Sequence, residues 1–93
     1  MKNKSLNYFC KIYGRVQGVG FRAWTKKTAE KYFLTGWVRN CDDSTVECEI
    51  SGHKKNLESF LNDCLNGPLL SLVRDIYKEK RRFKKYQTFE IHY

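Results

Sequence analysis

Hydrophobic and polar residues alternate with a period of two in two parts of the chain, and a third, short part is rich in β-forming residues. These three parts are predicted to be β-strands. The first strand is expected at Tyr8 to Tyr13, ending at Gly14. Two more are expected at Gly36 to Asn40 and at Val46 to Ile50. The polar run Cys41 to Ser44 lies between these two strands, so we expect them to form a hairpin.

A spacing of three to four residues replaces this alternation in two other segments and predicts amphipathic helices. One helix is expected at Phe21 to Tyr32, with Phe21, Thr25, Thr28 or Ala29, and Tyr32 on one face and charged residues elsewhere. The second follows Gly52 and is expected to end at Gly67-Pro68, a common helix stop signal. Its apolar face consists of Leu57, Phe60, Leu61, Cys64 and Leu65.

The last part of the chain predicts two strands, Leu72 to Tyr77 and Thr88 to Tyr93, separated by the basic stretch Lys78 to Lys85. We expect this stretch to be a solvated loop. The element order is then β-α-β-β-α-β with a short extra C-terminal strand. This order predicts an α+β, ferredoxin-like fold in which two helices cover one face of an antiparallel sheet. A chain of 93 residues forms one domain, residues 1–93.

The net charge of the chain indicates an anionic partner. The chain has 18 Lys and Arg against 10 Asp and Glu, a net charge of +8. A positive potential of this kind suits phosphorylated metabolites, nucleic acids or acidic membranes, so charge alone does not select the function.

The segment Met1 to Asn7 is polar and no apolar run follows it, so we expect no membrane span and a cytoplasmic location.

Cysteine and histidine spacing gives no indication of a metal site. Cys10, Cys41, Cys48 and Cys64 contain no Cys-x-x-Cys pair, and His53 and His92 do not complete a zinc-ligand pattern. We therefore expect free thiols, surface histidines, no metal and no cofactor. The adjacent acids at 42 and 43 are interpreted as turn formers rather than as an acid/base pair.

The segment Gly14 to Arg22 is the strongest candidate for chemistry, because it places three glycines within the seven residues 14–20, between a strand and a helix. Such a loop can turn its amides inward as a nest for an anion, next to the positive end of a helix dipole. Arg22 in the first helical turn can reach back over the loop with a bidentate guanidinium. A purely structural glycine loop remains the alternative from these residues alone.

Two other phosphate-binding motifs fit the loop poorly. No Gly-Lys-Ser/Thr follows it, which excludes a Walker motif. Gly18, Gly20 and Ala23 formally match a dinucleotide fingerprint, but that fold needs several parallel strands, whereas a hairpin follows here.

Five segments together resemble the acylphosphatase family in order and spacing. They are Gly14 to Arg22 (GRVQGVGFR), Gly36 to Asn40 (GWVRN), Val46-Glu47, Gly52 and Gly67-Pro68. The resemblance implies a metal-independent enzyme that hydrolyses acyl phosphates to a carboxylate and inorganic phosphate. It implies that Arg22 binds the phosphate and that Asn40 orients the attacking water. It also implies an amide cradle formed by Gln17, Gly18, Val19, Gly20 and Phe21.

The chemistry of an acyl phosphate agrees with this implication. Its leaving group is a stable carboxylate, so positioning and charge stabilisation can replace a metal, a nucleophile and a strong acid. Asn40, at the end of a predicted strand, could hold a water through its amide group. Without the resemblance, a turn residue that closes the strand is the better interpretation of Asn40.

The chain also departs from the family pattern. The family has glycine where this chain has Phe33, after the first helix, and Ser44, in the hairpin turn. These changes are expected to reduce stability or to alter the turns slightly, and neither touches the cradle. Thr25 and Thr28 stand where larger aliphatics are expected, which indicates a less apolar core there.

Two non-enzymatic functions remain as alternatives on the same fold. One is an RNA-binding module, disfavoured because the segment Val46 to Ile50 carries two acids in place of the aromatic motif of RNA-recognition domains. The other is a carbamoyl-phosphate-binding or regulatory domain. We therefore expect a small-molecule acyl phosphate as partner, with nucleic acid disfavoured, and a monomer.

Overall fold

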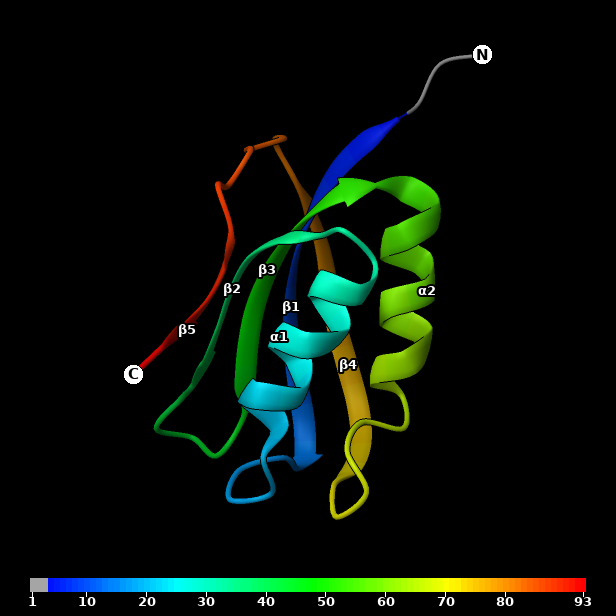
Figure 1. The fold of residues 1–93 in the computed structure, drawn as a ribbon. Coiled ribbons are helices and arrows are strands. Elements are labelled where there is room, and N and C mark those ends of the chain that lie inside the picture. Colours follow the sequence, from blue (N-terminus) through cyan, green and yellow to red (C-terminus); the bar gives the residue numbers. More distant parts are fainter. Residues whose placement is uncertain (1–3) are drawn as a thin grey trace.

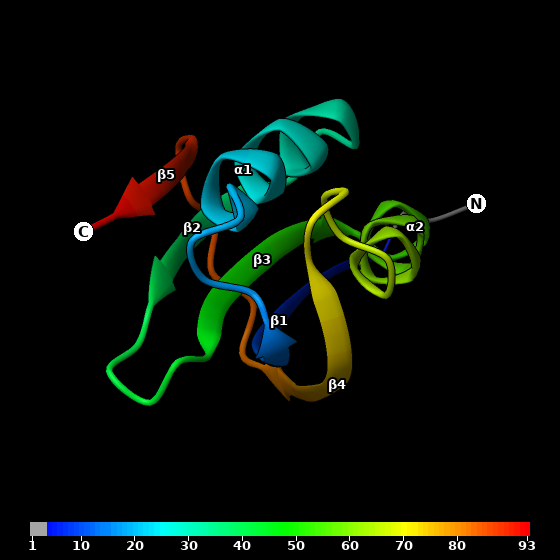
Figure 2. The same ribbon diagram turned by 90° about the horizontal axis from the view of Figure 1, so that it is seen from below.

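The computed structural model describes residues 4–93 and contains a five-stranded sheet with two helices packed on one face (Figures 1 and 2). The elements are β1 (Ser5–Arg15), α1 (Phe21–Lys31), β2 (Thr35–Asn40), β3 (Val46–His53), α2 (Lys54–Cys64), β4 (Leu72–Arg81) and β5 (Phe89–His92). The expected element order and the placement of both helices are confirmed. The expectation on Met1 to Asn7 falls partly on residues 1–3, outside the described residues.

The sheet has the strand order β4-β1-β3-β2-β5. The pairs β1–β3, β1–β4 and β2–β3 are antiparallel, as expected. The pair β2–β5 is parallel, with Gly36 opposite Phe89 and Arg39 opposite His92. The sheet is therefore mixed, and the expectation of a wholly antiparallel sheet is wrong for its last strand.

The direction of β5 follows from the place where the chain crosses the sheet. The end of β4 lies beside the start of β1, where Arg81 pairs with Asn7, and β2 begins at this same end. The connecting segment, residues 82–88, is held there by the buried side chains of Asn7 and Ser51, which donate to the carbonyls of Arg82 (3.2 Å) and Lys84 (2.6 Å). Because the segment arrives where β2 starts, β5 runs alongside β2 in the same direction.

Three strands, β1, β3 and β4, extend at least three residues beyond the sequence prediction, and β3 continues from Ile50 to His53. β1 passes through Gly14, where the register against β4 shifts, and continues to Arg15. Gly14 has φ 129, and a Cβ there would overlap the carbonyl oxygen of Leu72, so only glycine fits this bulge. β4 continues to Arg81 because the long strand β1 offers it pairing partners. Residues 78–81 of the basic stretch are thus strand, and only the rest is a connecting segment.

Both helices bury the faces that the periodicity predicts. α1 buries Phe21, Thr25, Thr28 and Ala29. The hydroxyl of Thr25 donates to the carbonyl of Phe21 (2.8 Å), which satisfies this polar group in the core. α2 buries Leu57, Phe60 and Cys64. The expectation that Leu65 lies on the buried face is wrong, because this side chain, at the C-cap of α2, is 59% exposed.

Gly67 ends the last turn of α2 as expected. Its φ is 63, and its amide donates to the carbonyl of Asp63 (3.0 Å). Phe33 and Ser44, which stand where the family pattern has glycine, have φ values of 59 and 74. Both are therefore in the left-handed region, where a side chain is disfavoured. The expected cost to stability thus has a structural basis.

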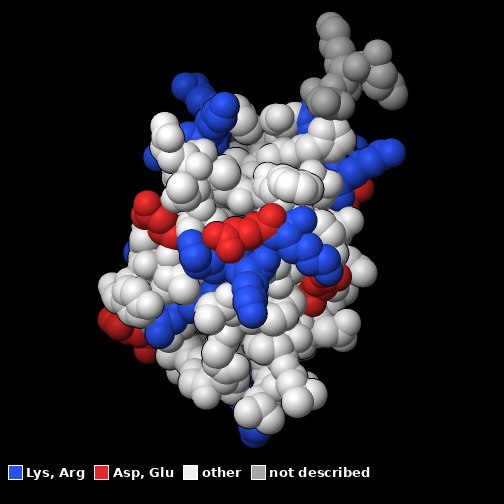
Figure 3. Space-filling model, in the orientation of Figure 1, with Lys and Arg blue, Asp and Glu red and all other residues white. Residues whose placement is uncertain are grey.

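On the helical face, the largest group of basic side chains lies in the middle of the view, in the region of α1 and next to acidic side chains, and smaller groups lie toward the edges (Figure 3). The lower part of this face in Figure 3, where the loop between β1 and α1 lies in Figure 1, is mostly uncharged.

Among residues 4–93, no helix is long and apolar enough to cross a membrane.

Candidate active site

The loop between β1 and α1 turns sharply at two glycines. Gly18 has φ 73, and Gly20, the N-cap of α1, has φ 77. A Cβ at either position would meet no atom within 4 Å, so the backbone conformation, not crowding, favours glycine there. No side chain caps the first turn of α1, so its free amide groups are available to an external anion.

A pocket of about 180 Å³ lies above this loop. It is lined by Val16, Gly18, Gly20, Phe21, Arg22, Ala23, Asn40, Ile91 and Tyr93. Arg22 comes from the first turn of α1 and Asn40 from the end of β2. Two predicted site residues that are far apart in sequence therefore face one cavity, beside the glycines of the loop.

Tyr93 and Ile91, which are not among the site residues predicted from the sequence, also line the pocket. The guanidinium carbon of Arg22 lies 4.8 Å from the centre of the Tyr93 ring, in cation–π geometry. No local motif marks these residues. They reach the pocket because β5 pairs with β2, which is a long-range feature.

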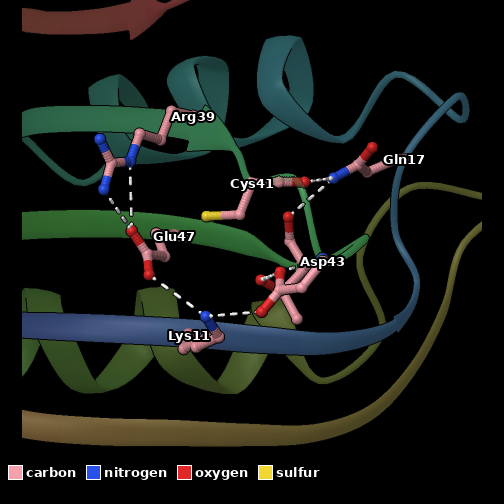
Figure 4. Close-up of polar contacts among 7 residues, drawn as sticks. Lys11, Gln17, Arg39, Cys41, Asp43 and Glu47 are labelled. Atoms are coloured by element: carbon pink, nitrogen blue, oxygen red, sulfur yellow. Dashed lines mark hydrogen bonds and ion pairs between the residues drawn. The ribbon is translucent and has the colours of Figure 1, made fainter.

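The remaining predicted loop residues are divided between two environments. Phe21 is buried, lines the pocket and packs against Trp24, with ring centres 5.5 Å apart. Val19 packs against the hydrophobic core. The side chain of Gln17 is directed to the β2–β3 turn, where its Nε2 donates to the carbonyls of Cys41 (2.8 Å) and Thr45 (2.9 Å) (Figure 4).

The β2–β3 turn, residues 41–45, has its own set of contacts (Figure 4). The amide of Cys41 donates to the carbonyl of Thr45 (2.9 Å). Asp43 accepts from the amide (3.1 Å) and the hydroxyl of Thr45, so it acts as a turn former, as expected. On the open face of the sheet, Lys11 Nζ lies 3.0 Å from Asp43 and 3.3 Å from Glu47.

These contacts change the acidity of the turn residues. Hydrogen bonds from Thr45, then from Lys11, lower the pKa of Asp43 to about 2. Partial burial acts to raise the pKa of Glu47, but hydrogen bonds, first among them from Arg39 (2.8 Å), outweigh it and lower that pKa. Asp43 and Glu47 are thus held ionised by structural contacts, and neither lines the pocket, so they are poor candidates for a general acid.

All four cysteines are free, as expected. Cys10, Cys48 and Cys64 are buried, and only Cys41 is partly exposed. Burial raises the pKa of the Cys64 thiol well above its usual value, and a contact with Cys10 together with burial does the same for Cys48. Among residues 4–93, no group of three or more His, Cys, Asp or Glu side chains is arranged to hold a metal ion.

The fold and the pocket define a small α+β protein with a glycine-rich loop beside a pocket at the start of α1. The family model for acylphosphatase matches residues 8–91. An acylphosphatase of Bacillus licheniformis is 43% identical over 89 residues, covering 95% of this chain and 99% of the relative. The crystal structure of acylphosphatase from Bacillus subtilis is 40% identical with a TM-score of 0.92, over 95% of this chain and 99% of that one.

The chain belongs to the acylphosphatase family, and the expected enzyme class, a hydrolase of acyl phosphates, is confirmed. The same fold also occurs inside a larger protein. Full-length HypF, solved in a phosphate- and nucleotide-bound form, aligns over 99% of this chain but only 12% of its own length (TM-score 0.87, 30% identity). Because relatives of this chain's own length are acylphosphatases, the non-enzymatic alternatives lose their support.

Proposed function

We propose that the pocket binds the phosphoryl group of an acyl phosphate through the main-chain amides of residues 17–21 and the guanidinium of Arg22. Asn40 holds a water molecule beside the phosphorus through its side-chain amide. The observation that carries this proposal is that Arg22 and Asn40 line one pocket with Gly18 and Gly20, next to the uncapped start of α1.

The proposed catalysis rests on charge stabilisation without a metal or a covalent intermediate. In the transition state, negative charge is spread over the oxygens of the transferred phosphoryl group. Fixed amides and a guanidinium directed at these oxygens stabilise that charge, as an oxyanion hole does. The carboxylate leaves without protonation, so no general acid is needed. The products are the carboxylate and inorganic phosphate.

We further propose that the protein acts as a monomeric, single-domain enzyme of residues 1–93 in the cytoplasm. Four free thiols, three of them buried, support a reducing compartment. Sedimentation at several protein concentrations tests the monomer, and a mass that rises with concentration contradicts it.

The enzymatic proposal is tested by hydrolysis of acetyl phosphate and benzoyl phosphate in the presence of EDTA. We expect full activity under chelation, and a loss in kcat of about 100- to 1,000-fold in Arg22→Ala. Arg22→Lys, which keeps the charge but not the planar fork, should recover only part of this loss. Activity that disappears with EDTA and returns with a divalent metal contradicts the metal-free mechanism.

A further inference from the structure

The carboxamide of Gln17 joins the loop that precedes α1 to the turn that follows Asn40 (Figure 4). Its Nε2 donates to the carbonyl of Cys41 at 2.8 Å and to that of Thr45 at 2.9 Å. An amide nitrogen carries two hydrogens, so both are used. The first acceptor belongs to the residue directly after Asn40.

The turn that Gln17 contacts is itself a defined frame. Main-chain bonds close it, from the amide of Cys41 to the carbonyl of Thr45 and from the amide of Ser44 to the carbonyl of Cys41 (3.2 Å). Asp43 binds Thr45 within the turn, and Lys11 holds Asp43 from the open face of the sheet. A contact to this turn therefore fixes the segment that carries Asn40, not only one carbonyl group.

The two halves of the pocket come from different elements. The loop with Gly18 and Gly20 belongs to the β1–α1 connection, whereas Asn40 ends β2. β1 and β2 are not neighbours in the sheet, because β3 lies between them. A direct link between the loop and the β2–β3 turn thus bridges two parts that the sheet joins only indirectly.

We infer that Gln17 is a positioning residue, whose side chain sets the place of Asn40 relative to the phosphate-binding loop. This inference rests on the proposed function, because it assigns Gln17 an effect through Asn40. It differs from the role expected from the sequence, where Gln17 contributes only its main-chain amide. The main chain supplies the cradle, and the side chain aligns the water-holding residue with it.

The first test compares kcat with inhibition by inorganic phosphate in Gln17→Met, which keeps the length of the side chain but loses both donors. Misplacement of a catalytic group by a fraction of a bond length lowers the rate strongly. We expect kcat for acetyl phosphate to fall about 10-fold, with the inhibition constant of phosphate changed less than about threefold. An unchanged kcat in the folded variant overturns the inference, and so does an equal loss in kcat and phosphate affinity.

Tyr32→Phe is the matched control, because it also removes one side-chain hydrogen bond between elements, from the Tyr32 hydroxyl to Asp63 (2.8 Å). This bond joins α1 to α2 at the far end of α1 from the pocket. We expect this control to keep kcat unchanged. A merely structural role of Gln17 would make the two variants behave alike.

A double-mutant cycle with Asn40→Ala separates this inference from the function on which it rests. In the Asn40→Ala background, Gln17→Met should cause no further loss in kcat, because its effect passes through the missing side chain. Fully additive losses overturn the inference while leaving the proposed role of Asn40 intact. An Asn40→Ala enzyme with normal kcat overturns both.

Gln17→Glu supplies a second variant if the methionine variant fails to fold. An ionised carboxylate would face two carbonyl oxygens without a proton, whereas the protonated acid can donate to one of them. The ratio of its kcat to that of the native enzyme should therefore rise as the pH falls through the pKa of the introduced glutamate. A ratio that does not change with pH overturns the positioning role.

Discussion

Replacing Phe33 by glycine should make the protein more stable, although it removes a large apolar side chain. Phe33 follows α1 with φ 59, and its side chain is 85% exposed. Truncation therefore loses almost no buried area. A residue with a Cβ pays about 1–2 kcal/mol in the left-handed region. Glycine is more flexible in the unfolded chain, which offsets about 0.5–1 kcal/mol of this gain.

The net gain expected for Phe33→Gly is therefore about 0.5–1 kcal/mol. For a domain of this size, 1 kcal/mol corresponds to roughly 4–8 °C in Tm, so we expect Tm to rise by roughly 2–8 °C. Urea unfolding and thermal unfolding both measure this change. The native chain and Phe33→Gly should have the same kcat, since Phe33 does not line the pocket.

Lys27→Gly is the control, because Lys27 is exposed in the middle of α1, where the backbone is helical. Glycine there should lower the free energy of unfolding by about 1 kcal/mol. Opposite signs for the two glycine variants would show that backbone conformation decides the outcome. A Tm that is unchanged or lower in Phe33→Gly refutes the reasoning.

Three further predictions follow from backbone and charge. Gly36→Ala should lower the free energy of unfolding in urea by roughly 3 kcal/mol or more, because Gly36 has φ 141 and a Cβ there would overlap the carbonyl oxygen of Glu49. Gly18→Ala should lower it by only about 1 kcal/mol, because the space around Gly18 is open. The pKa of Asp43 is about 2 in the folded protein and about 3.9 in the unfolded chain. The contribution of Asp43 to stability is therefore present above pH 4 and is lost as the pH falls towards 2. Asp43→Asn should show a smaller loss of stability between pH 4 and pH 2. A thiol reagent should modify Cys41 alone in the native protein and all four cysteines after unfolding, and rapid modification of more than one in the native state contradicts the buried thiols.

The parts of the fold that depend on local sequence were predictable. The apolar spacing of α2 and the stop at Gly67 gave this helix correctly, because both signals act within one or two turns. The left-handed positions at Phe33 and Ser44 were indicated by the family pattern rather than by the residues themselves. The loop glycines were informative because positive φ leaves few other choices.

The features that depend on distant contacts were not predictable from the sequence. The parallel direction of β5 is determined by the end of the sheet at which residues 82–88 cross. The extension of β4 depends on the length of β1. Tyr93 reaches Arg22, and Gln17 reaches Thr45, only after the strands have paired. A Gln side chain carries no sequence signal for such a contact.

The most direct test of the proposed active site is the steady-state hydrolysis of acetyl phosphate by Asn40→Ala, measured with the inhibition constant of inorganic phosphate. Asn40 is proposed to hold water and the loop with Arg22 to hold phosphate, so the two quantities should separate. We expect kcat to fall about 100-fold or more while phosphate binds about as well as to the native enzyme. A folded Asn40→Ala variant with native kcat would contradict the account, as would one that loses phosphate binding and kcat together.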